Sequence, residues 1–263
     1  MDLRVVRALI IKYAFAWSRS TFRMLDIFFW PMIDLLVWGF FTVYMLKVGN
    51  TVPTLITFLI AAIIYWNILY RSQQVVCVSI LDDVWSRNLL NIFAAPIRTI
   101  EYVGATYIIG LAQALIVVCL MGGLAYTIYS FNLLALGFGA ALLFVNLLLM
   151  GWSLGLFTIG FILRFGHTAE GLAWALPFLV QPVSAVFYPV SVLPAWMQTI
   201  AWCVPSTYVF EGLRQIVAQR QLDWHYLQHA FLLNLVYMVV CALVFHFLLE
   251  EARKLGYLAK YGT

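Results

Sequence analysis

Long apolar runs separated by short polar stretches make up most of the chain. A helix needs about 20 predominantly apolar residues to cross a hydrocarbon core about 30 Å thick. Six runs meet this requirement, so we predict six transmembrane helices, at residues 22–46, 54–80, 99–128, 133–163, 171–190 and 228–249. The predicted fold class is all-α, a polytopic membrane protein whose residues 1–263 form a single transmembrane domain.

The amino-acid composition agrees with this pattern. Hydrophobic residues occupy 65% of the 263 positions and charged residues 10%, whereas soluble domains have roughly 45–50% apolar and about 25% charged residues. The chain therefore lacks the polar surface of a soluble globule. Its four cysteines are scattered without a CxxC spacing, which indicates neither a metal site nor a disulfide framework.

The basic residues predict the orientation of the spans. With six spans both termini lie on one side, and twelve of the 15 lysines and arginines, Arg71 among them, fall on that side. Cytoplasmic loops of membrane proteins carry an excess of Lys and Arg. We therefore predict cytoplasmic termini, contact with membrane lipids and no nucleic-acid partner.

Residues 1–20 have the pattern of an amphipathic helix. At about 100° per residue, one face carries five apolar side chains, Val6, Leu9, Ile10, Tyr13 and Trp17. The opposite face carries four basic ones, Arg4, Arg7, Lys12 and Arg19. Such a helix lies in the membrane interface with its basic face toward the lipid headgroups.

A second amphipathic helix is predicted on the inner side, within residues 81–97. Its apolar residues recur at helical spacing, at Leu81, Val84, Trp85, Leu89 and Ile92, with Asp83, Arg87 and Asn91 on the other side. Pro96 ends the helix because proline lacks an N–H and disfavours the α conformation in the residue before it. The pattern fits an interfacial turn and a docking element for a soluble partner equally well.

The outer region, residues 181–220, cannot be one helix, because it contains Pro182, Pro189, Pro194 and Pro205. We predict two short apolar helices here, 195–203 and 207–218, inserted halfway or packed against the spans. Glu211 and Arg214 are spaced i, i+3, which favours a structural ion pair.

Two further features lie within the predicted spans. Asp34 falls halfway along the first, where a carboxylate costs roughly 2.5–3.5 kcal/mol, so it should face a cavity, a partner group or a subunit interface. Because Pro31 nearby can kink the helix, we favour a role at a polar hinge or an interface. Gly151 and Gly155 form a small-xxx-small pair that allows close helix packing.

Sequence motifs for catalysis or nucleotide binding are absent. The sequence has no GxxxxGK[ST], HExxH or GxSxG. His225 and His229 are spaced i, i+4 beside Asp223, which suits metal chelation. No third histidine or cysteine lies nearby, so we predict interfacial polar residues and no metal.

The order of these elements resembles the type-2 permease family of ABC exporters. Three stretches carry the resemblance: SRNLLNIFAAPI at 86–97, FYPVSVLPAWMQTIAWCVPSTYVFEGLR at 187–214, and the basic ending ARKLGYLAKYG. The resemblance implies a half-transporter of the bacterial cytoplasmic (inner) membrane. Two copies would pair to give twelve spans, and each would dock a separate soluble ATP-binding subunit. This chain would then bind no cofactor, with ATP and Mg²⁺ on the partner subunit.

The resemblance also implies roles for particular residues. Coupling to the ATPase falls to the inner segment, at Asp82, Asp83, Trp85, Arg87, Asn88, Leu89 and Pro96. An outer gate falls to the hairpin, at Pro194, Trp196, Pro205, Glu211 and Arg214.

The predicted function is ATP-driven export of an amphipathic or hydrophobic substrate, a drug or a lipid-like molecule. Export of a lipid-linked polysaccharide or glycolipid is the first alternative. An ion-coupled secondary transporter would need inverted repeats and buried ionisable groups. A lipid-modifying enzyme would depend on His225 and His229.

Overall fold

The computed structural model describes residues 2–48 and 53–255. The end of the predicted basic tail, residues 256–262 with Lys260, lies outside the described residues. All regular secondary structure in the described ranges is helical, which confirms the predicted all-α class.

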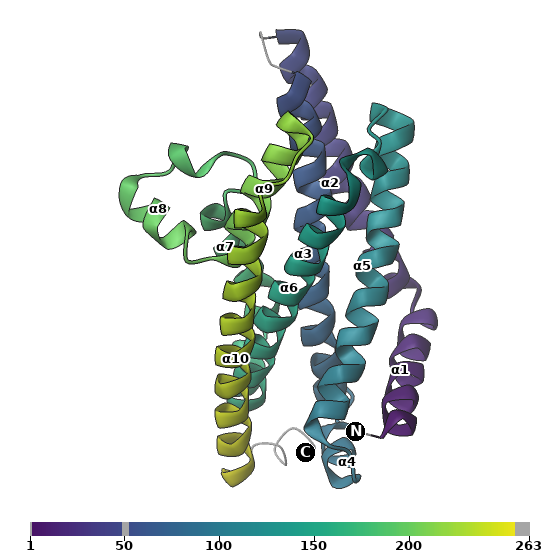
Figure 1. Ribbon diagram of the computed structural model, residues 1–263. Helices are drawn as coiled ribbons and strands as arrows, with labels where there is room; N and C mark the ends of the chain where they lie inside the picture. Colours follow the sequence, from purple (N-terminus) through teal and green to yellow (C-terminus); the bar gives the residue numbers. More distant parts are fainter. Residues whose placement is uncertain (1, 49–52, 256–263) are drawn as a thin grey trace.

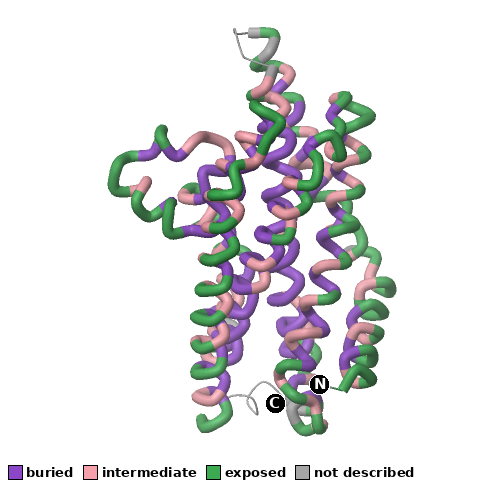
Figure 2. The backbone as a smooth tube through the Cα atoms, viewed as in Figure 1, coloured by how far each residue is buried: buried purple, intermediate pink, exposed green. Residues whose placement is uncertain are grey.

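Within residues 2–48 and 53–255, five helices are long and apolar enough to cross a membrane. They are α2 (Thr21–Val48), α3 (Pro53–Trp85), α5 (Thr99–Tyr129), α6 (Gly137–Phe165) and α10 (Trp224–Lys254). A short 3-10 turn, Leu133–Leu136, leads into α6. In its most apolar stretch α3 is 72% buried, against 28–39% in the other four, so α3 forms the centre of the bundle (Figures 1 and 2).

The predicted span at 171–190 is wrong as a single helix. It is replaced by α7 (Leu172–Val180), a 3-10 turn at Gln181–Ser184, and a left-handed residue, Ala185, with φ 52°. A short apolar run cannot distinguish one long helix from several short pieces, and the left-handed turn ends this one.

Helix α9 (Pro205–Gln219) follows further along the chain. The segment from α7 to α9, which replaces a regular span, is here called the broken passage. Together α7 and α9 lead the chain along the bundle to the end where α10 begins (Figure 1). As a result α1, α4 and the end of α10 share one end of the bundle, here called the α4 end.

Helix α1 (Leu3–Ser18) lies along α5 at the α4 end (Figure 1). Val6, Leu9 and Tyr13 are buried on the predicted apolar face. Arg4, Arg7 and Arg19 are exposed as the amphipathic pattern predicts. Lys12 differs, because it turns inward to pair with Asp83 of α3.

On the other side of the bundle, α8 (Ala195–Ala201) projects sideways next to α7 and α9 (Figure 1). It has a small core of its own, made of Ala185, Val190, Leu193 and Ala201. In the sequence, helices α8 and α9 thus correspond to the two short outer helices predicted at 195–203 and 207–218.

The closest helix contact joins α3 and α6 at the predicted glycine pair. A Cβ atom on Gly151 would lie 1.8 Å from Ser72 Oγ and 2.7 Å from the Leu69 carbonyl oxygen. A Cβ on Gly155 would lie 2.8 Å from Val76 Cβ. These two positions therefore have room only for glycine.

We predict that Gly151→Ala destabilises the bundle by about 1–3 kcal/mol, because the added methyl overpacks the α3–α6 contact. Thermal unfolding in detergent measures this as a lower melting temperature. Gly123→Ala in α5 is the matched control, since nothing lies within 4 Å of a Cβ there. Alanine is also the better helix former. A Gly151 variant as stable as the Gly123 variant would contradict the close packing at this position.

Candidate functional site

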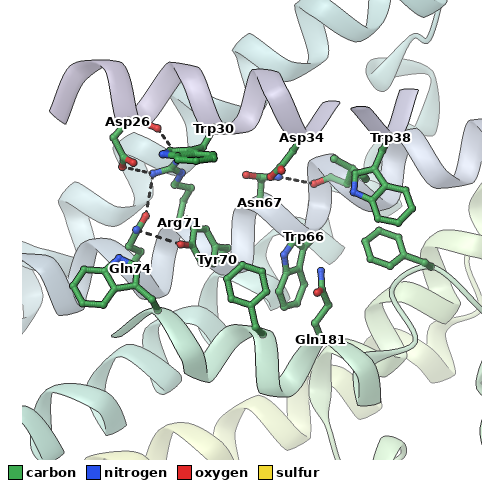
Figure 3. Close-up of a pocket in the computed structure, with 14 residues that line it drawn as sticks. Asp26, Trp30, Asp34, Trp38, Trp66, Asn67, Tyr70, Arg71, Gln74 and Gln181 are labelled. Atoms are coloured by element: carbon green, nitrogen blue, oxygen red, sulfur yellow. Dashed lines mark hydrogen bonds and ion pairs between the residues drawn. The ribbon is translucent and has the colours of Figure 1, made fainter. Parts of the chain in front are cut away.

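A cavity of about 540 Å³ opens between α2, α3 and α7 (Figure 3). Its aromatic lining consists of Trp30, Trp38, Trp66, Tyr70, Trp174, Phe178 and Phe187. Its polar lining consists of Asp26, Asp34, Asn67, Arg71, Gln74 and Gln181. Ile63 completes the wall. The cavity is thus both strongly aromatic and charged, although its walls belong to apolar helices.

Helical spacing brings these side chains to one place. On α2 the lining residues Asp26, Trp30, Asp34 and Trp38 follow one another every four positions. Residues three or four apart share a helix face. Only Asp34 was singled out from the sequence, although this four-residue spacing was the signal that would have identified the whole stripe.

Arg71 is the centre of the charged part of the cavity. It is 1% exposed, and its Nη1 lies 2.9 Å from Asp26 Oδ2 and 2.9 Å from Gln74 Oε1. Its Nη2 donates to the Asp26 carbonyl oxygen at 2.7 Å. Arg71 was counted with the basic residues of the cytoplasmic side, although it falls within the predicted span 54–80. It lies inside α3 and is neutralised by Asp26 of α2.

Asp34 lies at the cavity, half-buried, with its carboxylate beside the Asn67 side chain (Figure 3). The Asn67 side chain interacts with this carboxylate through a hydrogen bond, and the Arg71 guanidinium attracts it electrostatically at longer range. Three surroundings were predicted for this carboxylate: a cavity, a partner group or a subunit interface. The structure shows the cavity.

At the α4 end, the predicted amphipathic helix is present as two pieces. Helix α3 continues to Trp85, the chain turns through Arg87 with φ 54°, and α4 (Leu89–Ala94) follows. Ala95 is extended before Pro96, as expected for a residue that precedes proline.

Asp82 and Asp83, both expected to contact a partner, form ion pairs within the chain. Asp83 is 2% exposed and pairs with Lys12 of α1, while it accepts hydrogen bonds from Tyr102 Oη at 2.7 Å and Tyr13 Oη at 3.2 Å. Burial, and next the Asp83 carboxylate, raise the pKa of Tyr13, so its hydroxyl keeps the proton that it donates.

Asp82 forms the second of these pairs. Arg23 of α2 binds it with both terminal nitrogens, Nη2 to Oδ1 at 2.7 Å. Lys12 and Arg23 thus attach α1 and α2 to the same end of α3. Asp82 and Asp83 join helices of this chain, and their docking role stays a prediction.

The remaining coupling residues differ in exposure. Trp85 is 48% exposed, and its Nε1 donates to Glu170 Oε1 at 3.0 Å. Arg87 and Pro96 are exposed, and Asn88 is half-buried. Leu89 is buried at 1%. Of the seven predicted coupling residues, Trp85, Arg87 and Pro96 are thus the exposed ones.

Glu211 and Arg214 of α9 form the predicted ion pair, at 2.8 Å. Glu211 Oε1 also accepts from the Val190 backbone N–H at 2.8 Å, and Arg214 Nη2 donates to the Ala185 carbonyl oxygen at 3.1 Å. The pair therefore holds the loop between α7 and α8 against α9.

The other predicted gate residues precede this pair in the chain and differ in exposure. Pro205 is buried as the first residue of α9. Pro194 and Trp196 are exposed around the start of α8, Trp196 at 66%.

His225 and His229 lie side by side at the start of α10, with ring centroids 4.0 Å apart and ring planes tilted by 35°. The Asp223 side chain accepts from the His225 backbone N–H and so caps the helix. In the part of the chain that the structure describes, no three potential metal ligands come together.

We predict that Asp83→Asn loosens α1 from the bundle, because Lys12 loses its counter-charge and charged hydrogen bonds contribute about 1.5–3 kcal/mol. Trypsin cleavage at the exposed Arg4 and Arg7 measures the release. Glu250→Gln removes an equal charge from the exposed Glu250–Arg253 pair, which should contribute little. Equal cleavage rates in the two variants would disprove the anchoring role of Asp83.

Comparison with known families gives one result. Residues 10–218 match a family described as ABC-2 type transporter, a range that begins within α1 and ends within α9. A comparison with curated proteins finds no match. Since the matched range covers most of the 263 residues, the chain belongs to the ABC-2 type transporter family.

Proposed function

We propose that the chain is the transmembrane subunit of an ATP-driven exporter that moves an amphipathic or hydrophobic substrate out of the cytoplasm or its adjacent leaflet. The observation that carries this proposal is the cavity between α2, α3 and α7. Charged side chains within membrane spans are costly and mark substrate pathways. Here Asp26, Asp34 and Arg71 lie among aromatic rings, a lining suited to a molecule with apolar and polar parts.

The energy source lies on another subunit in this proposal. The family is a permease domain without a nucleotide-binding domain. A separate soluble ATPase would therefore bind ATP and Mg²⁺ and dock at the α4 end, on Trp85, Arg87 and Pro96. The basic bias predicted for this side supports a cytoplasmic location for the α4 end, and the proposed membrane is the inner membrane of a bacterium.

A second copy of the chain would close the cavity. The cavity opens on a face where α2 and α7 expose apolar side chains, with Trp30 55% and Phe178 54% exposed. Above it α2 continues with Val37, Phe40 and Tyr44, each exposed by more than half. A two-fold dimer through α2 and α7 would cover these residues, with ten long helices and two broken passages in place of twelve regular spans.

We predict that Arg87→Gly weakens association with the partner ATPase by about fivefold or more, as expected for a central interface residue. Glycine keeps the left-handed turn at Arg87. Arg220→Gly is the matched control, because Arg220 is also exposed and left-handed but lies at the opposite end. Co-purification and ATPase activity of the complex are the measurements.

Equal association of both glycine variants would disprove the docking surface. Proteoliposome transport that persists without ATP and partner would instead favour the ion-coupled transporter.

We predict that Val37→Cys in a Cys203→Ser background forms a disulfide-linked dimer on oxidation. Identical residues meet where a two-fold axis passes, and the proposed axis passes at the exposed face of α2 that carries Val37. The native Cys119 on α5 is exposed and should not cross-link in the parent. Non-reducing electrophoresis of membranes detects the dimer. A dimer that forms equally without the Val37 substitution would exclude an interface through α2.

A further inference from the structure

The cavity carries one unbalanced negative charge. Three charged residues line it, Asp26, Asp34 and Arg71. Arg71 pairs with Asp26 at 2.9 Å. Among the described residues, no cation lies within ion-pairing distance of the Asp34 carboxylate. The cavity as a whole therefore has a net charge of about −1 with its carboxylates ionised.

Arg71 is held away from Asp34. Both terminal nitrogens of its guanidinium bind Asp26, and Nη1 also binds Gln74. Figure 3 shows Asp34 beside Asn67, separate from this cluster. If Arg71 turned to pair with Asp34, it would break its ion pair with Asp26. Asp26 would then be the unpaired carboxylate in the same cavity, so the net charge would not change.

Indole rings surround the open carboxylate. Trp30 and Trp38 lie one helical turn before and after Asp34 on α2, and Trp66 lies next to Asn67 on α3. The faces of aromatic rings attract cations, and tryptophan does so most strongly. One face of Trp38 is covered by the stacked ring of Phe187, at 4.5 Å between centroids. A carboxylate in a cavity lined by tryptophans attracts cations by both interactions, and its charge repels anions.

We propose that the cavity binds an amphipathic organic cation, with its charge at Asp34 and its apolar part against Trp30, Trp38 and Trp66. This inference rests on the proposed function and names the substrate class. The cavity volume of about 540 Å³ falls within the roughly 300–1,000 Å³ of pockets for drug-sized ligands.

A neutral glycan is the competing ligand. The amides of Asn67, Gln74 and Gln181 offer donors and acceptors for hydroxyl groups, and tryptophans also stack on sugars. The hydroxyl groups of a glycan can donate to the Asp34 carboxylate, but they carry no positive charge to balance it. The unbalanced charge of Asp34 therefore favours the cation.

The test measures displaceable binding of tritiated tetraphenylphosphonium to the full chain reconstituted in nanodiscs. Tetraphenylborate serves as the matched anion because it has nearly the same size and shape with opposite charge. We expect saturable binding of the cation and no displacement by the anion. Saturable binding of the anion alone, or of neither ion, would overturn the proposal.

Variants locate the binding. Asp34→Asn should weaken cation binding by about tenfold or more, since the ion pair is lost. Trp30→Leu should weaken it by about three- to tenfold, and Trp30→Phe by less. Asp223→Asn is the charge-matched control, because asparagine caps a helix as well as aspartate does and Asp223 lies outside the cavity.

Each outcome has a distinct meaning. Cation binding that Asp34→Asn and Trp30→Leu leave unchanged would assign it to lipid or another surface and overturn the inference. Should Asp34→Asn not fold, the charge selectivity of the native chain and the Trp30 series still decide. All of these measurements omit ATP and the partner, so their failure leaves the exporter assignment intact. Failure of ATPase association would in turn leave cation binding intact.

Discussion

The packing of α3 against α6 at Gly151 and Gly155 determines where the rest of the bundle can lie. Ser72 and Val76 of α3 contact these glycines at close range, while Arg71, one residue earlier, faces the cavity. One face of α3 is thus fixed against a neighbouring backbone, and the next face presents charged and aromatic groups. The contact sets the rotation of α3 about its axis and, with it, the direction of every cavity side chain that α3 contributes.

Helix α3 also joins the two regions to which function is assigned. Arg71 at the cavity and Asp82 at the α4 end are eleven residues apart on the same helix, about 16 Å at 1.5 Å per residue. Arg71 pairs with Asp26 of α2, and Asp82 pairs with Arg23 of α2. A displacement of the α4 end would therefore reach the cavity through a continuous helix that two ion pairs attach to its neighbour.

The sequence predicted the long helices well, because each is a run of apolar residues long enough to be recognised without knowledge of its neighbours. It also predicted the Glu211–Arg214 pair, since the two residues are only one turn apart. The Lys12–Asp83 pair was not predictable in this way, because it joins residues that are distant in the chain. The Arg71–Asp26 pair escaped prediction for the same reason, because Asp26 lies on another helix.

The broken passage through α7 and α9 changes how substitutions act there. In an intact helix the backbone satisfies its own hydrogen bonds, so one apolar side chain can replace another at small cost. Around the break, side chains supply such hydrogen bonds instead. Thr207 donates to the Val183 carbonyl at 3.1 Å, and Arg214 donates to that of Ala185. A backbone group left unpaired in lipid costs several kcal/mol. Mutational tolerance should therefore be uneven along the chain, high at the exposed apolar positions of the long helices and low at the few polar positions that complete this passage.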